Sequence, residues 1–218
     1  MIRVSVSALD NWRYFIENDF KSTEEYIGEL CRLTPQSPAM IQGEDFHYLL
    51  QTGEPKLYTW EVTCDAALLQ PDLIEYPCRE TFTLDGEKVV LSGRIDAAHG
   101  DIVIDYKTTS RAINLEQYVD KWQWRAYLML MDMSKFRYDV FQYRINRKHG
   151  KGSFTVFDYR TLNLSAYKRM TDDVMGALRE YVQFLRGLKR SEWIEFDDRG
   201  YARAGRRYIA EGMKSKSA

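Results

Sequence analysis

Gly93-Arg94-Ile95-Asp96 and, after a short turn, Asp105-Tyr106-Lys107-Thr108 are the two stretches that decide the fold of this 218-residue chain. Each belongs to an apolar run typical of a β-strand, and the turn around Gly100 predicts that the two strands form a hairpin. Side chains two residues apart on a strand share a face, so Asp105 and Lys107 are expected to lie side by side. The hairpin then brings Asp96 next to Asp105.

Two aspartates and a lysine in this arrangement have the chemistry needed to cut a phosphodiester. Carboxylate oxygens bind hard divalent cations, and a nearby lysine can carry charge at a phosphate or orient an attacking water. The same residues could also be the solvated end of an ordinary hairpin. Residues on the neighbouring helices decide between these interpretations.

Four short motifs, taken in order, make the sequence similar to the PD-(D/E)XK nuclease superfamily, in particular its RecB-like exonuclease branch. They cover about residues 40 to 130 and are Gly43-x-x-x-His47, Gly93-x-x-Asp96, Asp105-x-Lys107 and Gln123-x-x-x-Tyr127. The opening Ser5-Val6-Ser7-Ala8-Leu9 also resembles the start of such proteins. Ile95 stands where the superfamily's name has a proline, and RecB-like members commonly look this way.

The resemblance implies a magnesium site, in which manganese should substitute because it accepts the same oxygen ligands. Its expected ligands are Asp96, Asp105 and His47. The backbone carbonyl of Tyr106 is a further candidate, and Lys107 would assist the water. His47 taken alone, beside Phe46 and Tyr48, would more often be a core or surface residue.

Three further residues have roles that the resemblance implies. Gln123 would hydrogen-bond a metal-bound water or a phosphate, and Tyr127 would contact the nucleic acid backbone. The alternative for this pair, four residues apart, is a polar shoulder of a helix. Glu80, at the start of the first predicted strand, would lie near the metal, although an exposed strand residue is an equally good interpretation.

The chain in order predicts an α/β domain with a mixed central sheet flanked by helices, a restriction-endonuclease-like core behind an N-terminal helical layer. Ser7 is expected to cap the first helix, with Asp10 reaching back as in a capping box. Predicted helices then begin after Ser22 and span 38–51 and 115–133, and a last helix, capped by Ser165, runs to about Leu188. Predicted strands span 79–84, 88–96, 101–108, 137–146 and 153–159. Residues 54–74 could continue the helical layer. One domain is predicted over 1–218, divided into the helical layer (1–74), the catalytic core (75–190) and a tail (191–218).

Composition limits the class of protein. With 44% hydrophobic residues the chain can bury a sizeable core, and no apolar run approaches the roughly 20 residues of a membrane span. The sequence opens with no secretory signal, which predicts a cytoplasmic protein. Cys31, Cys64 and Cys78 are an odd number without C-x-x-C spacing, so neither a disulfide framework nor a zinc site is expected. The iron–sulfur cluster of some relatives is not expected either, because it needs cysteines near the C-terminus.

The predicted partner is DNA, although a net charge of −1 neither requires nor excludes a polyanion. Two basic clusters are candidates to hold it: a loop with Arg147, Lys148 and Lys151, and a tail with Arg203, Arg206 and Arg207. The tail could equally be a solvated terminus.

The function that the sequence predicts is a magnesium-dependent DNA exonuclease in recombination, repair or phage DNA processing. Three alternatives remain: an endonuclease or nickase with the same site, a DNA-binding module without catalysis, and a scaffold for a recombination or phage protein. A recombination partner protein and a ring-shaped homo-oligomer that encloses DNA are further expectations, the ring from the resemblance.

Overall fold

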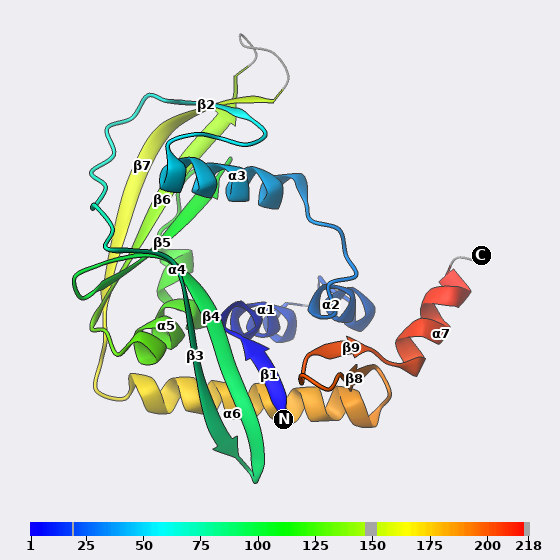
Figure 1. Cartoon of the computed structure of the whole chain (residues 1–218). Coiled ribbons are helices and arrows are strands. Elements are labelled where there is room, and N and C mark those ends of the chain that lie inside the picture. The colour runs from blue at the N-terminus through cyan, green and yellow to red at the C-terminus, as the bar shows by residue number, and fades with distance from the viewer. Residues whose placement is uncertain (19, 147–151, 216–218) are drawn as a thin grey trace.

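The computed structural model describes residues 1–18, 20–146 and 152–215 and has a mixed β-sheet with helices on both faces (Figure 1). The strands are β1 (Ile2–Ser5), β2 (Thr59–Val62), β3 (Leu73–Leu84), β4 (Glu87–His99), β5 (Ile102–Thr109), β6 (Lys135–Ile145), β7 (Ser153–Ser165), β8 (Ile194–Phe196) and β9 (Ala202–Ala204). The helices are α1 (Val6–Glu17), α2 (Thr23–Leu30), α3 (Pro38–Thr52), α4 (Glu116–Val119), α5 (Trp122–Met131), α6 (Met170–Arg190) and α7 (Arg206–Ser215). The predicted fold class is confirmed.

The main sheet runs in the order β1-β4-β5-β6-β7-β2, and β3 pairs with β4. Its centre is β4–β5, an antiparallel hairpin, followed by β6 parallel to β5. Both ends of the sheet differ from the sequence prediction. Residues 2–5 form β1, parallel to β4, and the segment expected to continue the helical layer instead carries β2, parallel to β7. Strands of four residues are too short to show alternation, and long-range pairing stabilises them.

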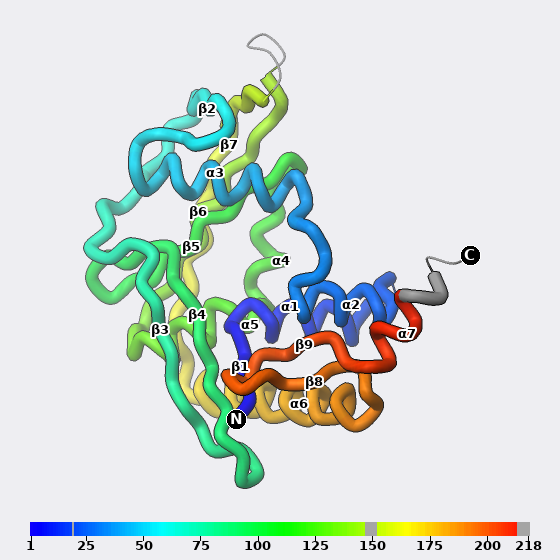
Figure 2. Tube along the Cα trace, turned by 45° about the vertical axis from the view of Figure 1, so that its right-hand side comes forward, coloured from blue at the N-terminus to red at the C-terminus, as the bar shows by residue number. Residues whose placement is uncertain are grey.

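Two hydrophobic clusters fill the space on the two faces of the sheet. The helix α3 lies on one side of the sheet, and α1, α5 and α6 lie on the other (Figure 2). On one face, α1, α2, α5 and α6 bury their apolar stripes against β4, β5 and β6. On the other face, Phe46 of α3 packs on Trp60 and Phe141. The alternation of β5 explains this division, because Val103 joins the first cluster while Ile104 and Tyr106 join the second. The side chains of Asp105 and Lys107 therefore point toward the α5 side.

The predicted starts and ends of the helices need two corrections. The first helix begins at Val6 after Ser5, so Ser7 is not its cap, and Asp10 does not reach back but accepts hydrogen bonds from the backbone of residues 122 and 123. The predicted helix over 115–133 is interrupted at residues 120 and 121 and becomes α4 and α5. The helical spacing of apolar residues continues across this break, which is why the sequence pattern did not show it. By contrast, the capping box of α2, with Ser22 and Glu25, is complete.

Three strand and tail boundaries also differ. β3 begins at Leu73, six residues before the predicted strand, and β7 continues through Ser165, which therefore does not cap the next helix. The C-terminal segment is ordered as β8, β9 and α7. Among the described residues, no helix is long and apolar enough to cross a bilayer.

Candidate active site

The site begins where β4 and β5 separate. Their ladder runs from the His99–Ile102 pair to the Ala97–Ile104 pair. One more step in this register would place Asp96 opposite Asp105. Instead of a ladder bond, Oδ2 of Asp96 accepts a hydrogen bond from the backbone N–H of Tyr106 at 2.8 Å. We call this opening between the two strands the fork. It holds Asp96 and Asp105, the two carboxylates that the sequence predicted to lie together.

Asp105 is the best-anchored side chain of the site. It is 3% exposed, its Oδ2 lies 2.6 Å from Nζ of Lys107, and its Oδ1 accepts a hydrogen bond of 2.9 Å from the side-chain amide of Gln123. Strand alternation places the lysine and α5 supplies the glutamine. Gln123 thus contacts Asp105 in the structure, and its hydrogen bond to a metal-bound water or a phosphate stays a prediction.

The charges in the fork shift the pKa values of its members. Burial, followed by the Asp105 carboxylate, raises the pKa of Asp96 to about 8, although Lys107 and the Tyr106 N–H oppose this shift. Burial alone would lower the pKa of Lys107, but Asp105 and Asp96 raise it above its usual value. Lys107 therefore stays protonated at neutral pH, whereas the Asp96 carboxyl is costly to ionise.

His47 reaches the same place from α3. Its Nδ1 lies 3.6 Å from Oδ2 of Asp96, and burial lowers its pKa, partly opposed by Asp105, so the ring is biased toward the neutral form that ligates metals. Gly43, one turn before His47, explains how α3 approaches so closely. A Cβ at this position would lie 3.2 Å from Oγ1 of Thr108, so the missing side chain permits the close approach.

Comparison with known proteins agrees with this geometry. The family model of the PD-(D/E)XK nuclease superfamily matches residues 17–199. The chain belongs to the PD-(D/E)XK nuclease superfamily. No curated protein matches its sequence.

Three solved structures similar to this nuclease-superfamily chain are distant from it in sequence. A crystal structure of SSO0001 has 18% identity and a TM-score of 0.48, over 79% of this chain and 75% of that one. LHK-Exo in complex with dAMP has 14% identity and a TM-score of 0.49, over 86% and 92%. A phage-related exonuclease from Haemophilus somnus 129PT has 13% identity and a TM-score of 0.34, over 84% and 82%.

Nucleases of this superfamily generally use divalent metals, and the donors in the fork fit such an ion by type. Asp96 and Asp105 offer carboxylate oxygens, and His47 offers a neutral nitrogen. The raised pKa of Asp96, caused by burial and then by the Asp105 carboxylate, indicates negative charge that a bound cation would neutralise. Within the described residues, however, the side chains do not already converge as a group of three or more metal-binding residues. Ligation by these residues and by the Tyr106 carbonyl stays a prediction.

Glu75 is a carboxylate near the site that sequence reasoning missed. The β3–β4 register places it opposite Asp96, between the Ile74–Ala97 and Tyr76–Ile95 pairs. Its φ is +50°. Its carboxylate forms an ion pair with Arg94 at 2.5 Å and accepts a hydrogen bond from the side-chain amide of Gln51 at 2.7 Å.

Glu80, the predicted neighbour of the metal, is instead exposed opposite Leu91, farther along β3. Because β3 begins at Leu73, Glu80 does not stand at the start of the strand as predicted. Pro77 argues against a central strand, but β3 pairs only with β4 in the described sheet, and such a strand tolerates proline.

Tyr127 lies behind the fork rather than in it. The side chain is 5% exposed, and its hydroxyl donates a 2.8 Å hydrogen bond to the carbonyl of Arg94. Its ring fills the space beside Gly93, where an added Cβ would lie 2.5 Å from Cε1. This explains the glycine of the Gly93-x-x-Asp96 motif, and it gives Tyr127 the observed role of supporting β4. Its predicted contact with a nucleic acid backbone stays a prediction.

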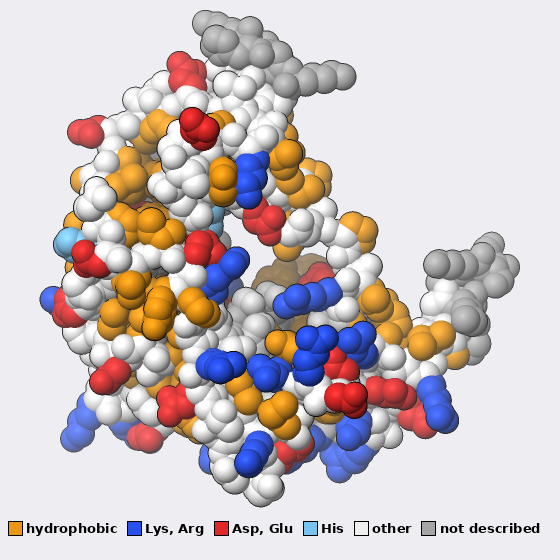
Figure 3. Space-filling view, in the orientation of Figure 1, with side chains coloured by type: hydrophobic (Ala, Val, Ile, Leu, Met, Phe, Trp, Pro, Cys, Tyr) orange, Lys and Arg blue, Asp and Glu red, His pale blue; other side chains and the backbone are white. Residues whose placement is uncertain are grey.

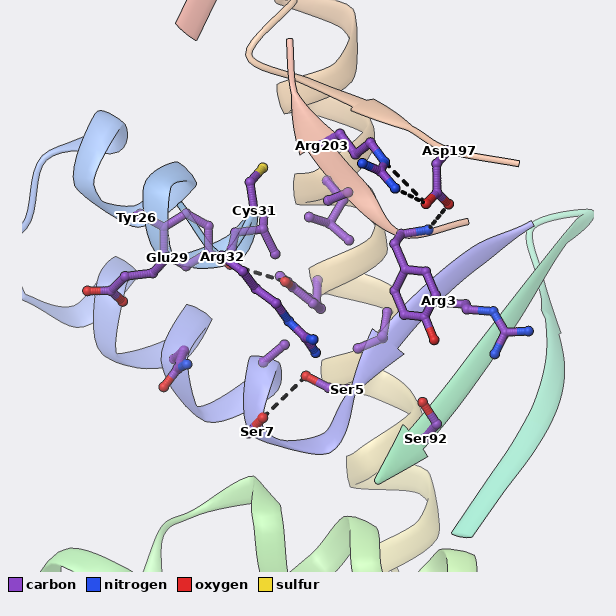
Figure 4. A pocket seen from close by; sticks show the side chains of 18 of the residues that line it. Arg3, Ser5, Ser7, Tyr26, Glu29, Cys31, Arg32, Ser92, Asp197 and Arg203 are labelled. Atoms are coloured by element: carbon purple, nitrogen blue, oxygen red, sulfur yellow. Dashed lines mark hydrogen bonds and ion pairs between the residues drawn. The ribbon is translucent and has the colours of Figure 1, made fainter. Parts of the chain in front are cut away.

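An arginine-lined cavity of about 670 Å³ opens beside β1 and the middle of β4 (Figure 4). Its charged and serine lining side chains are Arg3, Arg32, Arg199, Arg203, Glu29, Asp197, Ser5, Ser7 and Ser92. Four arginines against two acids make the lining positive. Arg203 pairs with Asp197 at 3.0 Å, whereas Arg32 extends from the end of α2 toward Ser5.

The predicted basic clusters are resolved only in part. Arg203 lines the cavity, while Arg207 pairs with Glu211 at 3.2 Å and lies over the ring of Trp193. Arg206 is exposed at the start of α7. Arg147, Lys148 and Lys151 lie outside the described residues. Lysine and arginine side chains also gather below a hollow in the middle of the face seen in Figure 3.

Proposed function

We propose that this chain is a metal-dependent deoxyribonuclease that hydrolyses phosphodiester bonds, with an exonuclease as the specific activity. The observation that supports it most is the fork. Separation of β4 and β5 puts Asp96 and Asp105 together, with Lys107 2.6 Å from Asp105 and His47 3.6 Å from Asp96. Two carboxylates that can hold a metal ion, with a lysine charge beside them, are the groups that hydrolysis of a phosphodiester needs.

Each residue of the fork has a part in this reaction. Asp96, Asp105 and His47 would hold magnesium, or manganese in its place. When bound, the ion supplies a more acidic water and neutralises charge on the leaving oxygen. Because Lys107 stays protonated, it acts as a positive charge toward the phosphate and the attacking water rather than as a base. Gln123 holds the Asp105 carboxylate in one orientation.

The arginine-lined cavity is the proposed place where the DNA backbone is held. Ser92 lines it and lies four residues before Asp96 on β4, about 13 Å at ~3.3 Å per strand residue. A DNA strand held in the cavity beside Ser92 would therefore lie about 13 Å from Asp96 along β4. Arg203 and Arg206 are additional candidates for phosphate contacts.

One assay separates this proposal from its alternatives. End-labelled linear duplex and covalently closed circular DNA are incubated with magnesium or with EDTA. Loss of the linear substrate alone, only with magnesium, is the expected result. Cutting of the circle would instead indicate an endonuclease or nickase, and binding without any loss would indicate a DNA-binding or scaffold protein.

Two aspartates of the same hairpin provide a test variant and its matched control. Asp105→Ala should abolish the loss of DNA, whereas Asp101→Ala, at the exposed turn where Asp101 pairs with Lys135, should not. Equal activity in both variants would refute the metal site. A ring-shaped oligomer and a recombination partner remain predictions, which light scattering and co-purification test.

A further inference from the structure

The break between α4 and α5 leaves the first turn of α5 without a local cap. The first N–H groups of a helix lack partners within the helix and need an outside acceptor. At the N-cap position stands Lys121, a residue with no acceptor in its side chain, and it makes no side-chain capping bond within the described structure. The acceptor comes from elsewhere in the chain.

It comes from Asp10 on α1, which is 112 residues away from Trp122. Oδ1 of Asp10 accepts the N–H of Trp122 at 2.6 Å, and Oδ2 accepts the N–H of Gln123 at 3.3 Å. A carboxylate at a helix N-terminus is also favoured by the helix dipole. One side chain thus caps α5 and ties it to α1.

The second residue of α5 is the one that touches the fork. The backbone of Gln123 is held by Asp10, and its side-chain amide donates to Oδ1 of Asp105, whose other oxygen contacts Lys107. Gln123 therefore connects Asp10 to Asp105, through one hydrogen bond of its backbone and one of its side chain. If the first turn of α5 rotates, the amide leaves Asp105, and the contact with Lys107 alone is left to orient the carboxylate.

We propose that Asp10 is a positioning residue: it fixes the first turn of α5 against α1, so that Gln123 holds Asp105 in the orientation that the fork needs. The catalytic consequence rests on the proposed nuclease function, whereas the structural consequence does not. A displacement of about 1 Å at a catalytic group costs on the order of 10²-fold in rate.

The test is a double-mutant cycle on magnesium-dependent DNA hydrolysis, with folding of every variant checked by circular dichroism. Asp10→Ala is expected to lower turnover by roughly 10- to 100-fold. In the Gln123→Ala background the same change should cost almost nothing more, because Asp10 acts through Gln123. Losses that multiply in the double variant would overturn the proposal.

Two further variants separate positioning from mere support of the fold. Adding Lys121→Ser to Asp10→Ala supplies a local cap, which should recover the unfolding temperature but not turnover, since the tie to α1 is still missing. Recovery of turnover along with stability would show a purely structural role. Asp120→Ala is the matched control, because this exposed carboxylate lies at the same helix break.

If Asp10→Ala does not fold, Asp10→Asn keeps one acceptor and should show a smaller loss, again absent in the Gln123→Ala background. The side-chain amide signal of Gln123 in nitrogen-15 NMR, assigned by its absence in Gln123→Ala, gives a readout that needs no activity. It should shift in Asp10→Ala and not in Asp120→Ala. An unmoved signal refutes the positioning role, whereas a wild-type protein without nuclease activity refutes only the proposed function.

Discussion

Replacing Asp96 by asparagine should make the metal-free protein more stable, and the gain should grow with pH. Burial and the neighbouring Asp105 carboxylate raise the pKa of Asp96 from 3.8 to about 8. In the folded state the carboxyl therefore keeps its proton over a range of pH in which the unfolded chain has lost it. The folded state binds more protons there, so the free energy of unfolding falls as pH rises from about 4 to about 8.

The size of the effect follows from the two pKa values. One pKa unit corresponds to about 1.4 kcal/mol, so the loss between pH 4 and pH 7 has an upper limit of about 4 kcal/mol. We expect Asp96→Asn to equal the parent protein near pH 4 and to exceed it by about 1 to 4 kcal/mol at pH 7. The amide oxygen can still accept the N–H of Tyr106.

Urea unfolding in EDTA at pH 4, 5, 6, 7 and 8 measures this difference. His47, whose pKa burial lowers, contributes a slope of opposite sign, but it does so in both proteins and cancels in the difference. Asp198→Asn, at an exposed carboxylate, is the control and should follow the parent curve. If the free energies of unfolding of Asp96→Asn and the parent differed by the same amount at every pH, the reasoning would be refuted. Magnesium at pH 7 should stabilise the parent and not the variant.

Three further predictions concern the fork and its surroundings. Lys107→Met should lower turnover by ~10²- to 10³-fold with magnesium affinity retained in calorimetry, and a collapse of affinity would make Lys107 structural. Gly93→Ala should destabilise by about 1 to 3 kcal/mol in urea, because the new Cβ would lie 2.5 Å from the Tyr127 ring, whereas Gly176→Ala, which has open space inside α6, should not destabilise. Arg32→Ala should reduce the slope of log affinity for DNA against log salt by ~0.7 to 0.9, and an unchanged slope would remove the arginine-lined cavity from the binding path.

Local periodicity was enough to predict the centre of the site. Strand alternation places Asp105 and Lys107 on one face, and the helical repeat aligns Gly43 with His47; neither depends on the rest of the fold. The hairpin around Gly100 then sets the distance from Asp96 to Asp105. These relations connect residues close in sequence, whose geometry the backbone itself fixes.

Only the tertiary structure decided the contacts between distant segments. The register of β3 against β4 puts Glu75, and not Glu80, opposite Asp96. The hydrogen bonds of Asp10 with the start of α5 divide one apolar helical pattern into two helices. Hydrophobic periodicity shows which face of an element is buried but not which partner covers it. Pairing and capping between segments a hundred residues apart form only when the whole chain packs.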